Sequence, residues 1–292
     1  MSEIRFDGRV AIVTGAGGGL GRAHALALAA RGARVVVNDL GRAEAVVAEI
    51  EAAGGEAMAS TASVSDSAAV AAMVAEVMDR WGRLDILINN AGILRDKSFA
   101  KTPPEGFEAV IDVHLRGAWI CSQAVWELMR EQGYGRILMT TSSSGLYGNF
   151  GQANYSAAKL AQVGLMNTLA IEGEKHGIRV NALAPAATTR MTEALLPPGT
   201  AELLAPEKVS PGALFLVSEA APTKTILTAG AGVFAVARIE ETPGIALGPD
   251  ASPEDVAAAW EHLAAQPVDK TVQAAWAQTA KFIAMAGGGT TP

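Results

Sequence analysis

Tyr155 and Lys159 stand four residues apart, and Ser142 lies thirteen residues before Tyr155. In a helix this spacing places the phenol and the ammonium on one face. A free phenol has a pKa near about 10 and is a weak base at neutral pH, but a nearby cation favours its phenolate form and lowers that pKa. The hydroxyl of Ser142, with Ser144 as the alternative, can hold a carbonyl oxygen. The three residues predict proton transfer to or from an alcohol.

A glycine-rich turn follows a short apolar run near the N-terminus. Residues 10–13 are Val-Ala-Ile-Val, and Gly15, Gly19, Leu20 and Gly21 come next, before a stretch rich in alanine and leucine. This order of strand, tight turn and helix is typical of a dinucleotide site. The glycines let the backbone approach a pyrophosphate, and the helix N-terminus offers it free N–H groups. We therefore expect these four residues to bind the phosphates of a dinucleotide.

The second apolar strand, residues 34–38, ends at Asp39. A carboxylate at this position can accept both hydroxyls of an adenosine ribose and repels a 2′-phosphate, which favours NAD over NADP. Arg22 and Arg42 are the nearest cations for such a phosphate, although both are more simply explained as solvated residues. A carboxylate that only caps the following turn is the alternative for Asp39.

Apolar strands alternate with helical stretches along the chain, which indicates an α/β protein with a single doubly wound Rossmann domain and a mostly parallel seven-stranded sheet. We expect this domain over residues 1–250 and a C-terminal helical extension and tail over 251–292. Either Ser65 or Asp66 is expected to cap the third helix. The predicted strands are 10–14, 34–38, 56–59, 84–89, 136–141, 179–184 and 231–236, and the predicted helices are 19–31, 42–53, 66–81, 105–132, 152–176 and 253–265.

The composition argues against several classes of protein. A net charge of −7 disfavours binding to nucleic acid, and no run of about 18 apolar residues predicts a membrane span. The single cysteine, Cys121, excludes an internal disulfide and is expected to be a small core residue. The first residues lack a signal-peptide core, and the last three are not a peroxisomal address. We expect a cytoplasmic enzyme without a metal site.

With these motifs in place, the chain resembles the short-chain dehydrogenase/reductase superfamily over nearly its whole length. A closer resemblance is to the (3R)-hydroxyacyl-CoA dehydrogenase modules of peroxisomal multifunctional enzymes type 2, also called 17β-hydroxysteroid dehydrogenase type 4. The runs that carry the first resemblance are 14–21, 89–92, 142, 155–159 and 181–185, and those that carry the second are 38–41, 90–99, 113–117, 147–155, 170–173 and 253–260.

The resemblance implies an oxidoreductase that transfers a hydride between NAD and a secondary alcohol or ketone, most closely (3R)-hydroxyacyl-CoA and 3-ketoacyl-CoA. It implies Tyr155 as the base, with Ser142 and Lys159 assisting. The alternatives are another short-chain alcohol dehydrogenase or carbonyl reductase for a steroid or small secondary alcohol, and a non-catalytic NAD-binding scaffold. A homodimer or homotetramer is also implied. The further cofactor contacts that the resemblance implies are Ser63, Val64, Asn90, Ala91, Gly92, Pro185 and Thr188, besides Tyr155 and Lys159.

His114 stands where most members of the superfamily carry an asparagine that anchors a water in the proton relay. The closer family resembles this chain in having a histidine there. The resemblance therefore makes His114 a candidate catalytic residue, which either relays protons or only braces a helix.

Residues 186–211 follow the sixth predicted strand and are placed to form a substrate lid, with a surface helix as the alternative. Arg95 and Lys97, or Arg190, are the cations that could contact an anionic CoA, and solvated surface charge is the alternative for each. The apolar lid residues that suit an acyl chain are Met191, Leu195, Leu196 and Leu203.

Overall fold

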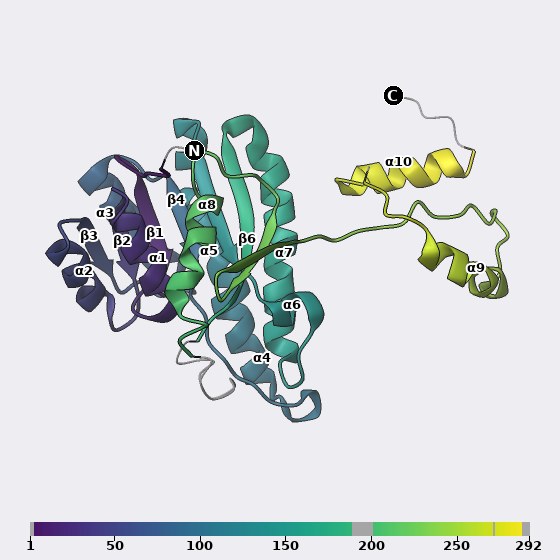
Figure 1. Cartoon of the computed structure of the whole chain (residues 1–292), viewed down its shortest axis with the longest axis horizontal. Coiled ribbons are helices and arrows are strands. Elements are labelled where there is room, and N and C mark those ends of the chain that lie inside the picture. Colours follow the sequence, from purple (N-terminus) through teal and green to yellow (C-terminus); the bar gives the residue numbers. More distant parts are fainter. Residues whose placement is uncertain (1–2, 189–200, 271, 288–292) are drawn as a thin grey trace. The chain divides into compact units, whose positions relative to one another are not determined.

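The computed structural model describes residues 3–188, 201–270 and 272–287. The chain divides into two compact units, Met1–Ala237 and Arg238–Pro292. The first unit is an α/β structure, drawn from purple to green in Figure 1, and the described residues of the second form two helices, drawn in yellow.

A single sheet runs through the first unit. Within the described residues it has eight strands in the order β3-β2-β1-β4-β5-β6-β7-β8. The first seven are parallel, and β8 pairs antiparallel with β7. The prediction of a Rossmann-type α/β fold is therefore confirmed. The strands are β1 Val10–Thr14, β2 Arg34–Asn38, β3 Glu56–Ser60, β4 Ile86–Asn89, β5 Gly135–Thr140, β6 Ile178–Ala186, β7 Ile226–Gly230 and β8 Val233–Ala237.

The predicted count of seven strands is too low by one. The sequence pattern placed the last strand at 231–236, but Ile226–Gly230 is the seventh parallel strand and Val233–Ala237 returns beside it. Ala231 and Gly232 form the turn between them, with φ of 52° and 76°. A type I′ hairpin turn requires positive φ at both central positions, and alanine rarely adopts such a φ. The pattern therefore gave no warning of a turn at Ala231.

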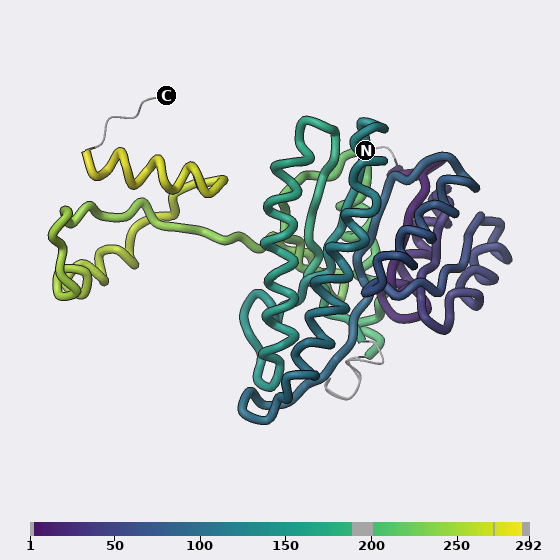
Figure 2. Tube along the Cα trace, turned by 180° about the vertical axis from the view of Figure 1, so that it is seen from behind, coloured from purple at the N-terminus to yellow at the C-terminus, as the bar shows by residue number. Residues whose placement is uncertain are grey.

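Helices cover both faces of the sheet because successive strand residues point to opposite sides. Ala11 and Val13 of β1 pack in one core cluster with residues of α1, α2 and α8, whereas Val10 and Ile12 pack in another with residues of α3, α5 and α7. Figures 1 and 2 show the two layers from opposite sides. These helices are α1 Gly19–Ala29, α2 Ala43–Ala52, α3 Ser67–Trp81, α5 Gly117–Gln132, α7 Ala153–Gly173 and α8 Ser210–Leu216.

The predicted helix over 105–132 consists of three parts. Helix α4 covers Pro104–Ile111, a π-helical turn η2 covers Asp112–Arg116, and α5 follows from Gly117. A π turn holds an extra residue in the helix and changes the direction of the side chains on either side. A Cβ at Gly117 would lie 2.7 Å from Cγ2 of Val64, so α5 approaches the loop after β3 closely. The remaining short helices are η1 Phe99–Lys101, α6 Ser143–Tyr147, η3 Glu174–His176 and η5 Pro206–Lys208.

Asp85 lies at the amino ends of the strands, with its side chain fully buried. It accepts hydrogen bonds from Arg9 at 2.9 Å, from Arg83 at 2.6 and 2.8 Å, and from the N–H of Val10 at 2.9 Å. Burial raises the pKa of this carboxyl, but the bonds from Arg83, Val10 and Arg9 outweigh burial and hold the pKa below its ordinary value. The ion pair therefore fixes β1 against β4.

Arg136 completes the polar cluster at the same ends of the strands. Its Nε donates to the carbonyl of Ser218 at 2.9 Å, and its Nη1 donates to that of Gly177 at 3.0 Å. The ring of Tyr134 lies between two guanidinium groups, 3.6 Å from Cζ of Arg9 and 4.1 Å from Cζ of Arg136. Cations over an aromatic face are attracted by its quadrupole, so the ring joins the two arginines.

Helix α1 is tied to α8 by a buried histidine. Nδ1 of His24 lies 2.9 Å from Oγ of Ser210, and Nε2 is buried without a hydrogen-bond partner among the described residues. Burial lowers the pKa of His24 to about 4. The ring is therefore neutral at physiological pH.

The second unit contains α9 Pro253–Ala265 and α10 Ala275–Met285. Ser252 and Asp255 form a capping box at the start of α9, which has the bounds predicted from the sequence. Glu241 bonds to Lys281 and pairs in an isolated bridge with Asp269. Residues just after β8 thus belong to this unit, which begins before the boundary predicted after residue 250. Among the described helices, none combines the length and apolar character that a membrane crossing requires.

Candidate active site

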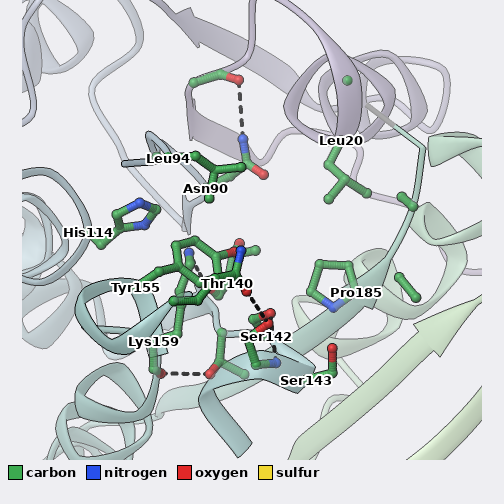
Figure 3. A pocket seen from close by; sticks show the side chains of 18 of the residues that line it. Leu20, Asn90, Leu94, His114, Thr140, Ser142, Ser143, Tyr155, Lys159 and Pro185 are labelled. Atoms are coloured by element: carbon green, nitrogen blue, oxygen red, sulfur yellow. Dashed lines mark hydrogen bonds between the residues drawn. The ribbon is translucent and has the colours of Figure 1, made fainter. Parts of the chain in front are cut away.

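A cavity of about 660 Å³ opens at the carboxyl ends of β1, β2, β4, β5 and β6. Ligands bind at this edge in doubly wound sheets. Figure 3 shows Tyr155 and His114 on the opposite side of the cavity from Leu20 and Pro185. The predicted site residues that line it are Gly15, Gly19, Leu20, Asp39, Asn90, Gly92, His114, Ser142, Tyr155, Lys159 and Pro185.

The glycine turn between β1 and α1 is closely packed. Gly15 has a φ of +62°, and a Cβ there would lie 2.8 Å from Cα of Ala91. A Cβ at Gly21 would lie 2.4 Å from the carbonyl oxygen of Gly15. No side chain caps the start of α1, where Gly18 is the N-cap residue. The cradle therefore leaves the helix N-terminus available to a phosphate, which fits a dinucleotide.

Asp39 lines the cavity and also holds the turn after β2. Its Oδ2 accepts from the N–H of Gly17 at 3.2 Å, and its Oδ1 accepts from the N–H groups of Gly41 and Arg42, each at 3.1 Å. The capping role that the sequence left open is thus present. Arg22, one of the two candidate phosphate cations, is bonded to Glu49 on the surface instead.

Asn90 ties the glycine turn to the end of β4. Its Nδ2 donates to the carbonyls of Thr14 at 2.9 Å and Gly15 at 3.1 Å. Oγ1 of Thr14 accepts in return from the N–H groups of Asn90 and Ala91, each at 3.0 Å. These bonds give the Asn-Asn-Ala-Gly run a structural role beside the cavity.

Tyr155 and Lys159 both lie in the first two turns of α7, so the four-residue spacing places them on one face. Nζ of Lys159 is 5.6 Å from the centre of the Tyr155 ring and donates to the carbonyl of Thr140 at 2.5 Å. Oγ1 of Thr141 donates to the carbonyl of Lys159 at 2.6 Å. The end of β5 therefore positions the lysine.

Ser142 is near enough to Tyr155 for its hydroxyl to lower the pKa of the phenol, and its Oγ accepts from the N–H of Ser144 at 3.2 Å as the cap of α6. Oγ of Ser144 donates instead to Oε1 of Gln152 at 2.8 Å, so Ser142 is the serine that acts on the phenol. The two hydroxyls together can hold one substrate oxygen.

Burial controls the proton affinities in the cavity. It raises the pKa of Tyr155; a hydrogen bond with Ser142 lowers it and the charge of Asp96 raises it further. Burial also lowers the pKa of Lys159 to about 7. The direction is thus opposite to the lowered phenol pKa expected from the sequence, because the loss of hydration outweighs the effect of Ser142.

His114 lies in the π-helical turn with its ring edge against Tyr155, at a centroid distance of 5.2 Å. Its Nε2 is 3.0 Å from the nitrogen and 2.8 Å from the oxygen of Ile93, and its Nδ1 has no hydrogen-bond partner among the described residues. Burial lowers the pKa of His114 to about 3, with Lys159 adding to the effect. A Cβ at Gly92 would lie 2.3 Å from this ring. The imidazole is thus neutral and fixed.

Five predicted cofactor residues do not line the cavity: Gly21, Ser63, Val64, Ala91 and Thr188. Val64 is buried and packs toward Gly117, and Ser63 bonds to Ser65 within its own loop. The N–H of Thr188 donates to the carbonyl of Leu204 at 2.7 Å, while its Oγ1 is buried without a hydrogen-bond partner in the described part of the chain.

Part of the predicted lid lies outside the described residues, as do Arg190, Met191, Leu195 and Leu196. Leu204 lines the cavity, whereas Leu203 is exposed. Arg95 and Lys97 are exposed and are not among the residues that line the cavity. Among the described residues, no group of histidine, cysteine, aspartate or glutamate side chains is arranged to hold a metal ion.

Gln152, for which the sequence pattern predicted no role, lines the cavity and is 5% exposed. It bonds to Asp96, Ser144 and Asn149. The signal available was its place three residues before Tyr155, which puts both on neighbouring positions at the start of α7.

The chain is similar to known proteins over most of its length. A family model described as short chain dehydrogenase matches residues 9–198. Peroxisomal multifunctional enzyme type 2 of Mus musculus is 49% identical over 277 residues, which cover 90% of this chain and 37% of the mouse protein. The chain thus spans well under half the length of that relative.

Solved structures with this fold include two that match over nearly all of their own length. A short chain dehydrogenase from Mycobacterium avium superposes with a TM-score of 0.80 at 41% identity, covering 89% of this chain and 96% of its own. A 7α-hydroxysteroid dehydrogenase, solved with NADH and 7-oxo glycochenodeoxycholic acid, superposes with a TM-score of 0.73 at 32% identity, covering 78% of this chain and 95% of its own.

Proposed function

Because the chain belongs to the short-chain dehydrogenase family, we propose that it interconverts (3R)-hydroxyacyl-CoA and 3-ketoacyl-CoA with NAD as the cofactor. Family membership makes it an oxidoreductase that uses a nicotinamide dinucleotide. The acyl-CoA substrate and the choice of NAD over NADP are the proposal. The observation that carries it is the placement of Tyr155, Ser142 and Lys159 on one cavity that begins at the glycine turn.

The likeness to the mouse multifunctional enzyme supports the acyl-CoA substrate, since the resemblance to its hydroxyacyl-CoA dehydrogenase module runs through the site itself. Residues 90–99 and 147–155, which carry that resemblance, contribute Leu94, Asn149 and Gln152 to the cavity wall. The closer family is thus recognised partly in residues that line the cavity.

In oxidation, Tyr155 accepts the proton of the substrate hydroxyl while Ser142 donates a hydrogen bond to the same oxygen as it becomes a carbonyl. When bound, an oxidised nicotinamide would supply the hydride acceptor for the carbon that carries this oxygen. Lys159, held by Thr140, contributes a proton donor beside the phenol and the expected ribose contact. Because burial raises the pKa of Tyr155, the phenol favours its protonated form. This is the form that ketone reduction requires, since the ketone oxygen must receive a proton.

Asp39 supports NAD because its carboxylate lies at the rim of the cavity, where a 2′-phosphate would meet a like charge. Arg22 is also paired with Glu49, so one of the two candidate cations for a 2′-phosphate is already neutralised. We expect kcat/KM to be higher for NAD than for NADP by about tenfold or more, a difference of about 1.4 kcal/mol. Asp39→Ala should reduce the ratio of kcat/KM for NAD to kcat/KM for NADP. The control, Asp66→Ala, removes a carboxylate that caps α3 and should leave this ratio unchanged.

We propose that His114 braces the site rather than relaying protons. A neutral ring fixed by Ile93 and packed against Tyr155 supports the bracing role. The cytoplasmic location and the homodimer or homotetramer stay predictions from the sequence.

The deciding experiment compares (3R)-3-hydroxybutyryl-CoA with its (3S) epimer and with the free (3R) acid, each with NAD, by following NADH absorbance. The proposal expects the (3R) thioester to have the highest kcat/KM. Equal kcat/KM values for the thioester and the free acid would contradict the proposal that the substrate is a CoA thioester. A preference for a hydroxysteroid would favour the alternative suggested by the likeness to 7α-hydroxysteroid dehydrogenase.

A further inference from the structure

The side-chain amide of Gln152 is held in one orientation at the cavity wall. Its Oε1 accepts from Oγ of Ser144 at 2.8 Å and from Nδ2 of Asn149 at 3.0 Å, and its Nε2 donates to Oδ2 of Asp96 at 2.7 Å. Because Nε2 faces a carboxylate and Oε1 faces the amide nitrogen of Asn149, exchanging the two ends of the amide would lose both of these bonds and keep only a bond with the hydroxyl of Ser144. The direction of the amide is therefore fixed by its neighbours.

One hydrogen of this amide remains for a ligand. Nε2 carries two hydrogens, and Asp96 is its one acceptor among the described residues. Gln152 is nonetheless 5% exposed and lines the cavity beside Tyr155. A buried donor without an acceptor is costly, so such groups are expected to meet a polar partner. The cavity is where that partner would bind.

The chemistry of a 3-oxoacyl thioester matches this donor. Such a substrate has two carbonyl oxygens separated by one methylene group, whereas a simple ketone has one. Tyr155 and Ser142 serve the oxygen that reacts. A second donor is then needed for the thioester oxygen, and Gln152 lies at the N-cap of α7, three residues before Tyr155.

We infer that Nε2 of Gln152 donates a hydrogen bond to the thioester oxygen of the substrate, and that Asp96 orients the amide for this contact. The inference rests on the proposed function and deepens it. Gln152 is thus a specificity-determining contact, and Asp96 is a positioning residue that acts through it. The contact distinguishes 3-oxoacyl and 3-hydroxyacyl thioesters from ketones and alcohols that lack a second carbonyl.

The loop that carries Asp96 is fastened to the segment that carries Gln152. The N–H of Lys97 donates to the carbonyl of Gly151 at 2.9 Å, and Nδ2 of Asn154 donates to the carbonyl of Arg95 at 3.1 Å. These bonds lie on either side of the Asp96–Gln152 pair in both segments. The carboxylate is therefore held against the amide by backbone as well as side-chain contacts.

The test measures kcat and KM with NADH for two substrates, acetoacetyl-CoA and 2-octanone, which lacks the second carbonyl. Gln152→Met keeps the length of the side chain and removes its donor. We expect it to lower kcat/KM for acetoacetyl-CoA by about 10- to 100-fold, the range that corresponds to the loss of one buried hydrogen bond. For 2-octanone the change should stay within about threefold.

The matched control is Gln132→Met, which removes a second part-buried amide with bonds to Leu84 at the far end of the sheet. It should affect both substrates equally or neither. Asp96→Ala should raise KM for acetoacetyl-CoA with little change in kcat, and Asp96→Asn, which keeps an acceptor oxygen, should restore much of the affinity. The two Asp96 variants also carry the test should Gln152→Met fail to fold, as judged by NADH binding.

A fall that is equal for both substrates in Gln152→Met and Asp96→Ala would overturn the inference, because it would indicate a general structural role. So would wild-type kcat/KM for acetoacetyl-CoA in Gln152→Met. Both results leave the proposed function standing. The absence of acetoacetyl-CoA turnover by the wild-type protein, with 2-octanone still reduced, would overturn the proposed function and this inference with it.

Discussion

Buried polar groups at the amino ends of the strands are bonded through several atoms, whereas several at the cavity side are not. Asp85 accepts from Arg9, Arg83 and Val10, and Arg136 donates to backbone carbonyls. On the cavity side, among the described residues, Oγ1 of Thr140, Oγ1 of Thr188 and Nδ1 of His114 are buried without a hydrogen-bond partner.

The difference separates two uses of buried polarity. A buried ion pair with all its partners present loses much stability if one partner is removed. A buried group without a partner lowers stability but leaves a donor or acceptor in place for a ligand. The polar groups at the amino ends of the sheet therefore stabilise the fold. Those at the carboxyl ends lie beside the candidate active site and lower the stability of the fold somewhat. Substitutions at the two ends should have opposite signatures.

Tyr155→Phe should give the largest effect, because it removes the group that exchanges a proton with substrate. We expect kcat to fall by about 10³-fold, within the range of general acid–base catalysis, with little change in NADH affinity or in the free energy of unfolding. The control, Tyr134→Phe, also removes one phenol hydroxyl, but from the ring that contacts Arg9 at the amino ends of the strands. It should leave kcat unaltered. A Tyr155→Phe variant with kcat comparable to wild type would contradict the assignment.

Among these substitutions, Asp85→Ala should lower the free energy of unfolding the most. It leaves Arg9 and Arg83 without their buried partner, and we expect the free energy of unfolding to fall by about 3–5 kcal/mol in urea denaturation. The kcat of the folded protein should stay the same. Asp79→Ala, at an exposed position of α3, is the control and should change stability by less than about 0.5 kcal/mol. Loss of kcat without loss of stability in Asp85→Ala would reverse the comparison.

The buried histidines should make stability depend on pH. Burial lowers the pKa of His24 from 6.5 to about 4, so the unfolded chain binds a proton in this window and the folded protein does not. Stability is then complete above about pH 6.5 and is lost as pH falls toward 4, by about 3 kcal/mol for His24. The pKa of Asp85 is held below its ordinary 3.8, so its contribution is lost only at still lower pH.

His24→Gln checks this window, because glutamine can bond to Ser210 but does not titrate. Unfolding curves measured from pH 7 to 4 should show a smaller slope for this variant, with His114 supplying part of what remains. An identical slope in the variant and the wild-type protein would exclude His24 as the source.

Thr140→Val should give the smallest effect and the opposite sign. Replacing a buried hydroxyl without a partner by a methyl group of the same shape should raise the free energy of unfolding by about 1 kcal/mol. Thr14→Val is the matched control: its hydroxyl accepts from Asn90 and Ala91, so the same change should be destabilising. Destabilisation by Thr140→Val in thermal melts would show that its hydroxyl has a partner in solution.

The sequence was sufficient where local rules decide the outcome. Residues 10–14 and 34–38 are strands as predicted, because apolar runs bounded by turns are typical of buried parallel strands. Helix α9 matches its predicted bounds because Ser252 and Asp255 fix its first turn. The pairing of Tyr155 with Lys159 depends only on the helical repeat.

Features that depend on distant residues could not be predicted in this way. The raised pKa of Tyr155 follows from burial by other elements, and the orientation of Gln152 depends on Asp96 from a separate loop. Ala231 adopts a positive φ only because β8 must return beside β7. The π turn at Asp112–Arg116 looks like ordinary helix in the sequence, since no residue type marks an extra residue in a turn.

That turn has a consequence for how such a chain can diverge. Because the wide turn counts one residue more than an α-helix of the same path, deleting a single codon within Asp112–Arg116 could restore regular helix. The deletion would rotate α4 by roughly 100° relative to α5 and move His114 away from Tyr155. No point mutation produces the same change. A one-residue change of length in this turn should therefore alter the site more than many amino-acid replacements elsewhere along the helix.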